Sequence, residues 1–352
     1  MVAKNTGEER RGGIMDNYNS IAVTSRIRFA RNFSNISFIS KLTDDDEIDY
    51  LVQSTRGLFE HMGGFAYYSL SKMPLSRCTA LLERHIISKE LIENRDISSV
   101  IINEDESIII MVGEEDHIRE QSISKGFDLQ GAYDRLIPID EEILTHFNIA
   151  YDDEYGFLTS SPANLGPAMR ASIMVFIPAL ERNGKIDELI SSARKYGLTF
   201  RGMYGEGTDA IGSFYQISNQ GSLGLTEEEI IDKVSDFFLD VSKQEESLRG
   251  ELFDNNYIEL RDEVQRAYGI LTNCYSITEN EMIKLLSLLK LGSIYDMVKI
   301  KDEEMFMKLY YHGGGSNLKE IIKFSKEKKE NVVRAEYISK RVKNLVFLGG
   351  EL

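Results

Sequence analysis

The chain has 352 residues, of which 42% are hydrophobic and 28% charged, so it is long enough to bury a large core in two or three domains. The 57 acidic and 41 basic residues give a net charge of −16, which argues against a general binder of nucleic acids or anionic membranes. Two distant cysteines, five scattered histidines and the lack of an apolar run of about 20 residues predict a cytoplasmic chain without a zinc site or a membrane span.

The first predicted elements follow a polar N-terminal segment. Residues 1–14 are rich in charge and lack a hydrophobic signal core, so we expect them to be disordered and the folded structure to begin near Met15. From Thr43, an acidic first turn precedes apolar residues at helical spacing, which predicts a surface helix. Two apolar runs between Ile97 and Val112, separated by three acidic residues, predict a β-hairpin that ends at a charged turn.

The middle of the chain alternates turns with short apolar stretches. The turn SSPANLGP predicts that a helix follows over residues 169–176 and is disturbed by Pro178. Farther on, the stretch LTF predicts a strand that enters a glycine-rich loop at Arg201.

The last third of the chain is expected to be helical. Thr226 and Glu229 form a capping box ahead of an amphipathic pattern. Beyond about Ser242 the patterns are long and helical, with few strand signals. We therefore predict a mixed α/β domain over residues 15–243 and a helical domain over residues 244–352.

Five arginines lie in short motifs with small or turn-forming neighbours. In SRIRFAR, strand alternation would place Arg26 and Arg28 on the same side of the strand. Two guanidinium groups on one side can hold phosphate oxygens bidentately. A solvated edge strand is the alternative interpretation of that motif. Together, the five could offset the charge of a nucleotide's phosphates, with Mg²⁺ bridging the phosphates. The five are Arg26, Arg28, Arg119, Arg170 and Arg201.

Two glutamates accompany these arginines. Glu115 belongs to GEEDHIR, for which a solvated acidic turn is the default interpretation, and Glu206 belongs to RGMYGEG. Carboxylates beside a polyphosphate are repulsive unless the second substrate is cationic, and two carboxylates can hold the donors of one guanidinium. Because a guanidinium has a pKa above about 12, its attacking nitrogen needs a positioned base. We predict that Glu115 and Glu206 are the catalytic residues.

Four strings resemble, in order, the guanidino (phosphagen) kinases and, within that family, the protein arginine kinases of bacteria: SRIRFARN, GEEDHIR, LTSSPANLGPAMRASIM and RGMYGEGTDAIGSFYQISNQ. The resemblance runs from about Val23 to Arg341. It implies an α+β fold, in which a catalytic domain with an antiparallel sheet flanked by helices precedes an α-helical C-terminal domain for regulation or substrate docking. It also implies transfer of the γ-phosphoryl group of ATP to arginine side chains of proteins.

Carried over position by position, the resemblance implies a set of ATP-binding residues, with Mg²⁺ accompanying the ATP and no metal site made by the protein alone. These residues are Ser25, Arg26, Ile27, Arg28, Phe29, His85, Arg119, Arg170, Ala171, Ser172, Ile173, Met174, Arg201, Gly202, Met203, Tyr204, Gly205 and Glu206. The partners implied are protein substrates with exposed arginine, the activator McsA, Clp protease components in a stress response, and a second copy of the chain.

The sequence departs from the family pattern at several positions, and the departures that bear on function lie in two motifs. Ser161 stands where a reactive cysteine is usual, so we expect slower turnover or insensitivity to thiol oxidation. Near the C-terminus, ENVVRA stands in for the RDxxRA motif that forms an allosteric phosphoarginine pocket in relatives. We expect this pocket to be weak or absent. The positions concerned are Glu330, Asn331, Arg334 and Ala335.

Three alternative interpretations remain open at this stage. The residues from Gly205 to Ala210 fit a dinucleotide fingerprint, which would indicate a nicotinamide- or flavin-dependent oxidoreductase, although no βαβ units surround them. The departures from the family pattern could instead mark a catalytically impaired scaffold that binds nucleotide or arginine. The third alternative is a guanidino kinase that acts on a small molecule.

Overall fold

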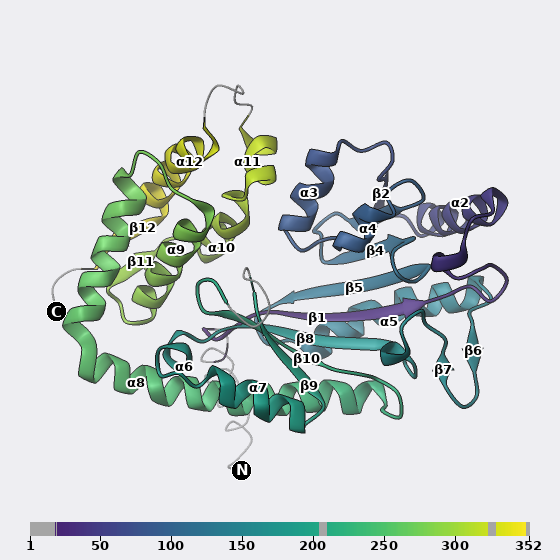
Figure 1. Cartoon of the computed structure of the whole chain (residues 1–352), viewed down its shortest axis with the longest axis horizontal. Coiled ribbons are helices and arrows are strands. Elements are labelled where there is room, and N and C mark those ends of the chain that lie inside the picture. The colour runs from purple at the N-terminus through teal and green to yellow at the C-terminus, as the bar shows by residue number, and fades with distance from the viewer. Residues whose placement is uncertain (1–17, 19, 204–209, 323–328, 350–352) are drawn as a thin grey trace, which may run out of the picture.

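A computed structural model describes residues 18, 20–203, 210–322 and 329–349 (Figure 1). Residues 1–14, predicted to be disordered, and Glu206 lie outside this part of the chain. The main feature is an eight-stranded sheet with the order β2-β3-β4-β5-β1-β8-β10-β9, in which every neighbouring pair is antiparallel. The fold is therefore α+β, as predicted.

The strands of this sheet are β1 (Ala22–Arg31), β2 (Phe65–Ser69), β3 (Ser99–Asn103), β4 (Ile108–Val112), β5 (Ile118–Lys125), β8 (Met169–Phe176), β9 (Leu198–Gly202) and β10 (Phe214–Asn219). Two smaller sheets pair β6 (Tyr151–Asp152) with β7 (Gly156–Phe157) and β11 (Val298–Ile300) with β12 (Val346–Leu348). The α-helices are α2 (Asp45–Met62), α3 (Leu75–Glu83), α4 (Lys89–Glu93), α5 (Leu129–His146), α6 (Pro178–Arg182), α7 (Ile186–Lys195), α8 (Glu227–Asn273), α9 (Glu279–Ile294), α10 (Glu303–His312), α11 (Gly315–Ile321) and α12 (Glu330–Leu345).

Helices cover the two faces of the sheet unequally. On one face, α5, α7 and α8 pack on β1, β8, β9 and β10 around a large buried cluster, and α2 and α5 cover the β3 and β4 end. On the opposite face, residues from α3 and α4 pack on β3 and β4. Figure 1 shows α3 and α9 to α12 on the same side of the sheet, with α6, α7 and the first part of α8 on the other, while the rest of α8 rises beside α9 and α12.

Several predicted elements are confirmed. The helix expected after Thr43 is α2, where the side chain of Asp44 caps the first turn and the buried side includes Leu51, Leu58 and Phe59. The predicted hairpin is β3 paired with β4, and the strand before the glycine-rich loop is β9. No helix of the described residues is long and apolar enough to cross a membrane.

The helix predicted over residues 169–176 is wrong, because this segment is strand β8. It pairs with β1 on one side and β10 on the other, and six of its eight residues are buried. Its last four residues, 173–176, are all apolar, and periodicity cannot distinguish so short a run in a strand from part of a buried helix. The alternation of polar and apolar residues over 169–173 is the signal for a strand. Pro178 does not interrupt a helix but begins α6, where its missing N–H is harmless.

Helix α8 joins the sheet to the helices α9 to α12, which we call the helical part of the chain. It begins at the predicted capping box, where Thr226 accepts a hydrogen bond from the Glu229 N–H and the Glu229 side chain accepts one from the Thr226 N–H. The domain boundary predicted at residues 243 and 244 falls inside this helix, which kinks farther on at Asn256. The division into domains at that boundary stays a prediction.

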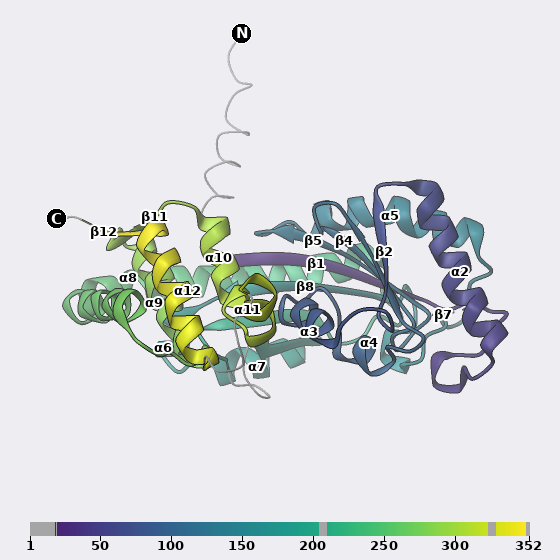
Figure 2. The ribbon, with the colours of Figure 1, turned by 90° about the horizontal axis from the view of Figure 1, so that it is seen from above.

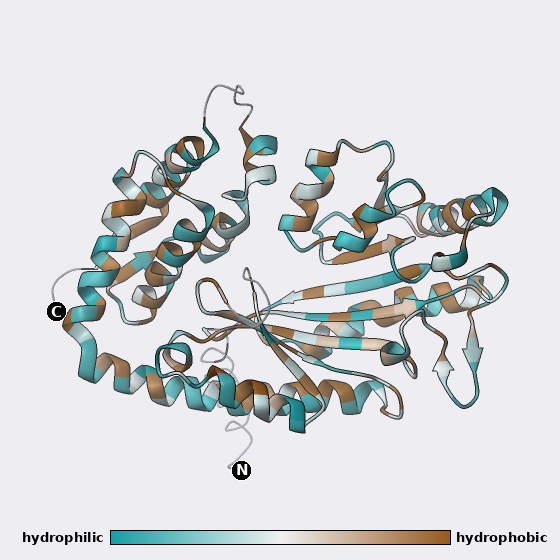
Figure 3. Cartoon of the chain, in the orientation of Figure 1, coloured by the Kyte–Doolittle hydropathy of each residue, from teal (hydrophilic) through white to brown (hydrophobic). Residues whose placement is uncertain are grey.

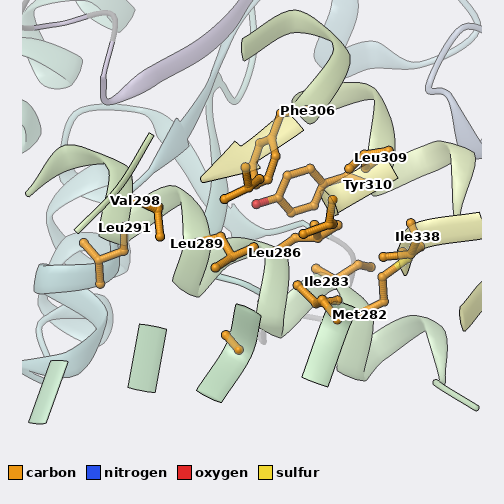
Figure 4. Packing of buried hydrophobic residues seen from close by; sticks show 14 of the residues in the cluster. Met282, Ile283, Leu286, Leu289, Leu291, Val298, Phe306, Leu309, Tyr310 and Ile338 are labelled. Atoms are coloured by element: carbon orange, nitrogen blue, oxygen red, sulfur yellow. The ribbon is translucent and has the colours of Figure 1, made fainter. Parts of the chain in front are cut away.

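The core of the helical part reaches the sheet, because it includes Phe176 of β8 and Phe214 of β10. Leu286 and Leu289 of α9 pack with Phe306 and Leu309 of α10 and with Ile338 of α12 (Figure 4). Figure 3 shows the apolar stripes of these helices, and Figure 2 shows α9 to α12 gathered at one end of the molecule. This core is distinct from the one that lies between the sheet and α5, α7 and α8.

Candidate active site

Strands β5, β1 and β8 bring four of the five predicted arginines to one face of the sheet. Arg28 lies directly opposite Arg170, and Arg26 lies two positions before Arg28 on the same strand. On the other side of β1, Arg119 lies opposite Ala30, which is two positions after Arg28. Paired residues, and residues two positions apart in a strand, point to the same side of a sheet. The four side chains therefore share one face.

The fifth arginine joins them through β10. Arg201 lies opposite Gln216, and Gln216 lies opposite Met174, which is four positions after Arg170 on β8. The same alternation places Arg201 with the other four. We call this side of the sheet the arginine face; it carries Arg26, Arg28, Arg119, Arg170 and Arg201.

The described residues use only part of the hydrogen-bonding capacity of the guanidinium groups on this face. Arg119 pairs with the buried carboxylate of Glu114. Arg201 Nη2 donates to Gln216 Oε1 at 2.9 Å, and Arg170 Nη2 donates to Ser218 Oγ at 3.0 Å. These partners position the arginines, but only Glu114 brings a negative charge.

Three guanidinium nitrogens have no hydrogen-bond partner among the described residues, although they are buried: Nε and Nη2 of Arg28 and Nε of Arg170. Burial, followed by the charge of neighbouring arginines, lowers the pKa of Arg26 and of Arg170 to about 10 and that of Arg28 well below its usual value. A bound polyanion would satisfy the free donors and offset the mutual repulsion. The arginine face therefore fits the phosphates of a nucleotide.

A small cavity joins this face to Glu115. It measures about 70 Å³, and its lining includes Arg28, Arg119, Arg170, Glu114 and Glu115. Glu115 is an exposed residue at the edge of this cavity. Partial burial of its carboxylate, followed by the charges of the nearby Asp116 and Glu114, raises its pKa. A carboxylate with a raised pKa beside a phosphate-sized basic cluster is placed to accept a proton from a bound guanidinium.

A buried hydrogen-bond network fixes the turn that carries Glu115. Asp116 accepts a hydrogen bond from Asn32 Nδ2 and another from the Ser160 N–H, both at 2.7 Å. Ser160 Oγ donates to the Glu115 carbonyl oxygen at 2.7 Å. The default interpretation of a solvated acidic turn is wrong for Glu114 and Asp116, because both are buried and paired.

The other implied ATP contacts fall on both faces of the sheet. Ser172 and Met174 share the arginine face, whereas five side chains point to the opposite face, where they are buried. These five are Ser25, Ile27, Phe29, Ala171 and Ile173. Gly202 ends β9 and Met203 follows it, while Tyr204, Gly205 and Glu206 lie outside the described residues.

His85 lies beside the arginine face at the end of α3. Its backbone has a φ of 56°, a conformation that costs energy in a residue with a side chain. Burial and the nearby Arg26 and Arg201 lower its pKa to about 4, so its imidazole is neutral near pH 7. A neutral imidazole can contribute to a nucleotide site without adding to the positive charge.

Sequence reasoning missed the residues that hold the arginines in place. Gln216 and Ser218 are polar residues two positions apart in the otherwise apolar middle of β10, and this alternation was the available signal. Glu114 and Asn32 gave no such signal, because their partners are distant in the sequence. The described residues contain no group of three or more His, Cys, Asp or Glu side chains that could hold a metal ion.

The C-terminal motif lies in the helical part. Arg334 is buried and donates from Nε to the Gly313 carbonyl oxygen at 2.6 Å and from Nη2 to Glu330 Oε1 at 2.7 Å. Its Nη1 donates to Asn331 Oδ1 at 2.5 Å and to the Ile277 carbonyl oxygen at 3.2 Å. Every nitrogen of this guanidinium is therefore engaged inside the protein, and its ion-pair partners are Glu330 and, at 3.6 Å, Glu279.

Comparison with known proteins identifies the family. The family model for the ATP:guanido phosphotransferase C-terminal catalytic domain matches residues 48–248, and that for the protein-arginine kinase McsB C-terminal domain matches residues 257–347. The protein-arginine kinase of Clostridium acetobutylicum is 37% identical over 92% of this chain and 97% of its own length. The chain belongs to the protein-arginine kinase family. Its chemistry is that of an ATP-dependent phosphotransferase acting on guanidinium groups.

Other relatives and solved structures agree with this family. The protein-arginine kinase of Clostridium tetani is 34% identical over 94% of this chain and 98% of its own length. Lombricine kinase aligns over 66% of this chain and 68% of its own with a TM-score of 0.58 and 23% identity. The taurocyamine kinase of Schistosoma mansoni aligns over 80% of this chain and 47% of its own with a TM-score of 0.61 and 20% identity. These two likenesses show a shared fold. The oxidoreductase alternative is wrong, because the sheet is antiparallel and lacks βαβ units.

Proposed function

We propose that this chain transfers the γ-phosphoryl group of ATP to arginine side chains of proteins. One observation carries the proposal: five arginines gather on one face of the sheet, where Glu114 is their one carboxylate partner among the described residues, and Glu115 borders the same cavity. The relatives that match over nearly the whole chain are named for the same reaction.

In this proposal, each group on the arginine face has a separate task. Arg28, Arg119 and Arg170 hold the phosphate oxygens and offset the charge that develops during transfer. Mg²⁺ would accompany ATP and bridge its phosphates. Glu115 holds the incoming guanidinium and, with Glu206 from the glycine-rich loop, accepts the proton that the attacking nitrogen loses.

The test uses γ-labelled ATP with either an arginine-rich protein or free arginine as the acceptor. We expect acid-labile phosphate on arginine residues of the protein and none on free arginine. Transfer to free arginine alone would indicate a small-molecule guanidino kinase. Nucleotide binding without transfer to either acceptor would indicate the impaired scaffold. Ser161→Cys, which restores the usual cysteine, would then be the first variant to measure.

We further propose the partners that the family resemblance implies. They are the activator McsA, Clp protease components that receive the modified proteins in a stress response, and a second copy of this chain, all in the cytoplasm. The catalytic domain would cover residues 15–243 and the regulatory or docking domain residues 244–352. Phosphoproteomics of arginine sites in cells with and without the gene, together with light scattering of the purified chain, tests these assignments.

A further inference from the structure

A second cavity lies where the sheet meets the helical part of the chain. It measures about 600 Å³ and is lined by the beginning of β1, the end of β5, and residues of α9 and α10. Thr24, which lies opposite Lys125 of this lining, is four residues from Arg28, or about 13 Å along β1. Arg28, Arg119 and Arg170 do not line this cavity, so it is separate from the candidate active site.

The unusual group in this cavity is the ammonium of Lys290. The residue is 9% exposed and lines the cavity, and no hydrogen bond contributes to its pKa. Its Nζ lies over the ring of Phe176, 5.5 Å from the ring centroid. Burial lowers the pKa of Lys290, and the charge of Glu303, which raises this pKa, acts without an ion pair, so the positive charge of Lys290 is only partly offset.

Neighbouring charges leave this cavity positive. Arg249, which lies close to Lys290, is already neutralised, because its Nε donates to Glu245 Oε1 at 2.7 Å. Lys125 lies exposed at the rim and adds a second ammonium. Glu303, also exposed, is the acidic residue in the lining; its charge acts on Lys290, but the two form no ion pair. Two ammonium groups therefore face one carboxylate across the cavity.

The remaining lining is largely apolar. Val23, Ile294 and Met307 contribute aliphatic and thioether surface beside the two lysines. An inorganic ion would leave this surface exposed to water, whereas a ligand with a short apolar body would cover it. The cavity thus combines a charged end with an apolar wall.

We propose that this cavity binds a small organic anion, a carboxylate or a phosphate monoester, whose charged group pairs with Lys290 and Lys125 and whose body packs on Val23, Ile294 and Met307. Because its walls come from both the sheet and the helical part, the bound anion would hold these two parts together. The proposal does not depend on the reaction at the arginine face.

Thermal unfolding at constant ionic strength tests this site, with phenyl phosphate as the probe and inorganic phosphate as the comparison. We expect phenyl phosphate to raise the Tm of the wild type in a saturable way and to act at lower concentration than inorganic phosphate. The variant Lys290→Met should lose this increase. Lys284→Met, which removes an exposed lysine from the same helix, should keep it.

Lys290→Met also controls for binding at the candidate active site, because it leaves all five arginines intact. Equal increases in Tm for the wild type and for Lys290→Met would overturn the proposal. If Lys290→Met does not fold, Lys125→Gln, which changes an exposed side chain, decides the question. Its half-saturating concentration should rise about tenfold, as expected for a lost charge-assisted contact, and an unchanged value would also overturn the proposal.

Discussion

Individual residues on the arginine face lower the stability of the nucleotide-free protein. Arg28 is the clearest case, since two of its buried nitrogens have no partner among the described residues and three other arginines lower its pKa. Uncompensated charge in a protein interior destabilises the fold and is characteristic of sites that bind a ligand of opposite charge. This reasoning yields predictions about stability as well as about activity.

We expect Arg28→Met to stabilise the nucleotide-free protein by about 1 kcal/mol, because it removes a repulsive and incompletely bonded charge. The same change should weaken ATP binding at least tenfold, since a charged phosphate contact is lost. Urea unfolding and nucleotide titration measure the two effects. Arg56→Met, on the exposed surface of α2, is the control that should alter neither. A variant that loses stability and keeps its affinity for ATP would contradict the role given to Arg28.

Glu115→Gln should separate binding from transfer. We expect ATP affinity to be largely unchanged and the transfer rate to fall by a factor of about 10² to 10⁴, the range associated with a general base. Initial rates with γ-labelled ATP measure this, and Glu93→Gln, an exposed glutamate of α4, serves as the control. The same result is expected for Glu206→Gln. Wild-type turnover in both variants would show that the assigned base is wrong.

Glu120, on the face opposite the arginines, should make stability depend on pH. Its buried carboxyl group lies near Asp140, which already pairs with Arg31 at 2.7 Å, and burial, followed by Asp140, raises the pKa of Glu120 well above its usual value. A raised pKa in the folded state means that the protonated group stabilises the fold. That contribution is complete below about pH 4 and is lost as the pH rises through the folded-state pKa.

The measurement for Glu120 is urea unfolding at pH 5 and pH 8. We expect Glu120→Gln to reduce the fall in the free energy of unfolding between the two pH values by about 1 to 3 kcal/mol, because the amide cannot ionise. Glu141→Gln, an exposed residue of α5, should retain the wild-type difference. Parallel behaviour of the wild type and Glu120→Gln would rule out this source of pH dependence.

At the scale of elements, α11 depends on a side chain from another part of the chain. This seven-residue helix has no side-chain cap of its own, and the carboxylate of Glu83, in α3, accepts hydrogen bonds from the Ser316 and Asn317 N–H groups at 2.8 and 2.9 Å. Asn317 Nδ2 also donates to the Ala80 carbonyl oxygen at 3.0 Å. Helix α3, which leads to His85, is thereby joined to the helical part.

We expect Glu83→Ala to lower the free energy of unfolding by about 1 to 2 kcal/mol, because the first turn of α11 loses its cap. Hydrogen exchange should locate the effect in residues 315–321. Glu104→Ala, which removes a glutamate from the turn between β3 and β4, is the control. If exchange in α11 were the same in Glu83→Ala and in the wild type, this contact would not stabilise the helix.

The sequence predicted elements well where the spacing of polar and apolar residues or a clear turn marked them. Helix α2 and the capping box of α8 carry polar and apolar residues at helical spacing, so their patterns are unambiguous. Strand β8 ends in four apolar residues, 173–176, which fit a buried helix as well as a strand, and the alternation over residues 169–173 that marks a strand is short. The candidate site was predictable in its residue types. The support from Gln216 and Glu114 was not, because it depends on strand register.

At the scale of the whole molecule, the arginine of the C-terminal motif, for which we predict a weak or absent phosphoarginine pocket, is already bound inside the helical part. The guanidinium of Arg334 is bound by Glu330, Asn331 and two backbone carbonyls. A phosphate would have to displace the carboxylate of Glu330, which also pairs with Lys319 at 3.1 Å. Regulation by free phosphoarginine would therefore work against bonds that the folded chain already makes.

Calorimetry with phosphoarginine tests this expectation. We expect no binding in the helical part of the wild type, because every nitrogen of Arg334 is already engaged. Arg334→Ala should destabilise the protein by about 3 kcal/mol, since it leaves buried acceptors and a carboxylate without a partner. Tight phosphoarginine binding that Arg334→Ala abolishes would refute the expectation.

Helix α8 is the covalent link between the sheet and the helical part, and its 47 residues contain one non-helical position, Asn256. Each residue of an α-helix turns the chain by about 100° and advances it by about 1.5 Å. Inserting one alanine next to Asn256 would thus rotate α9 to α12 by about 100°, a little more than a quarter of a revolution, around the axis of α8, whereas inserting four would bring them back to within about 40° of their original direction. The orientation of the helical part relative to the sheet therefore depends on the number of residues in α8.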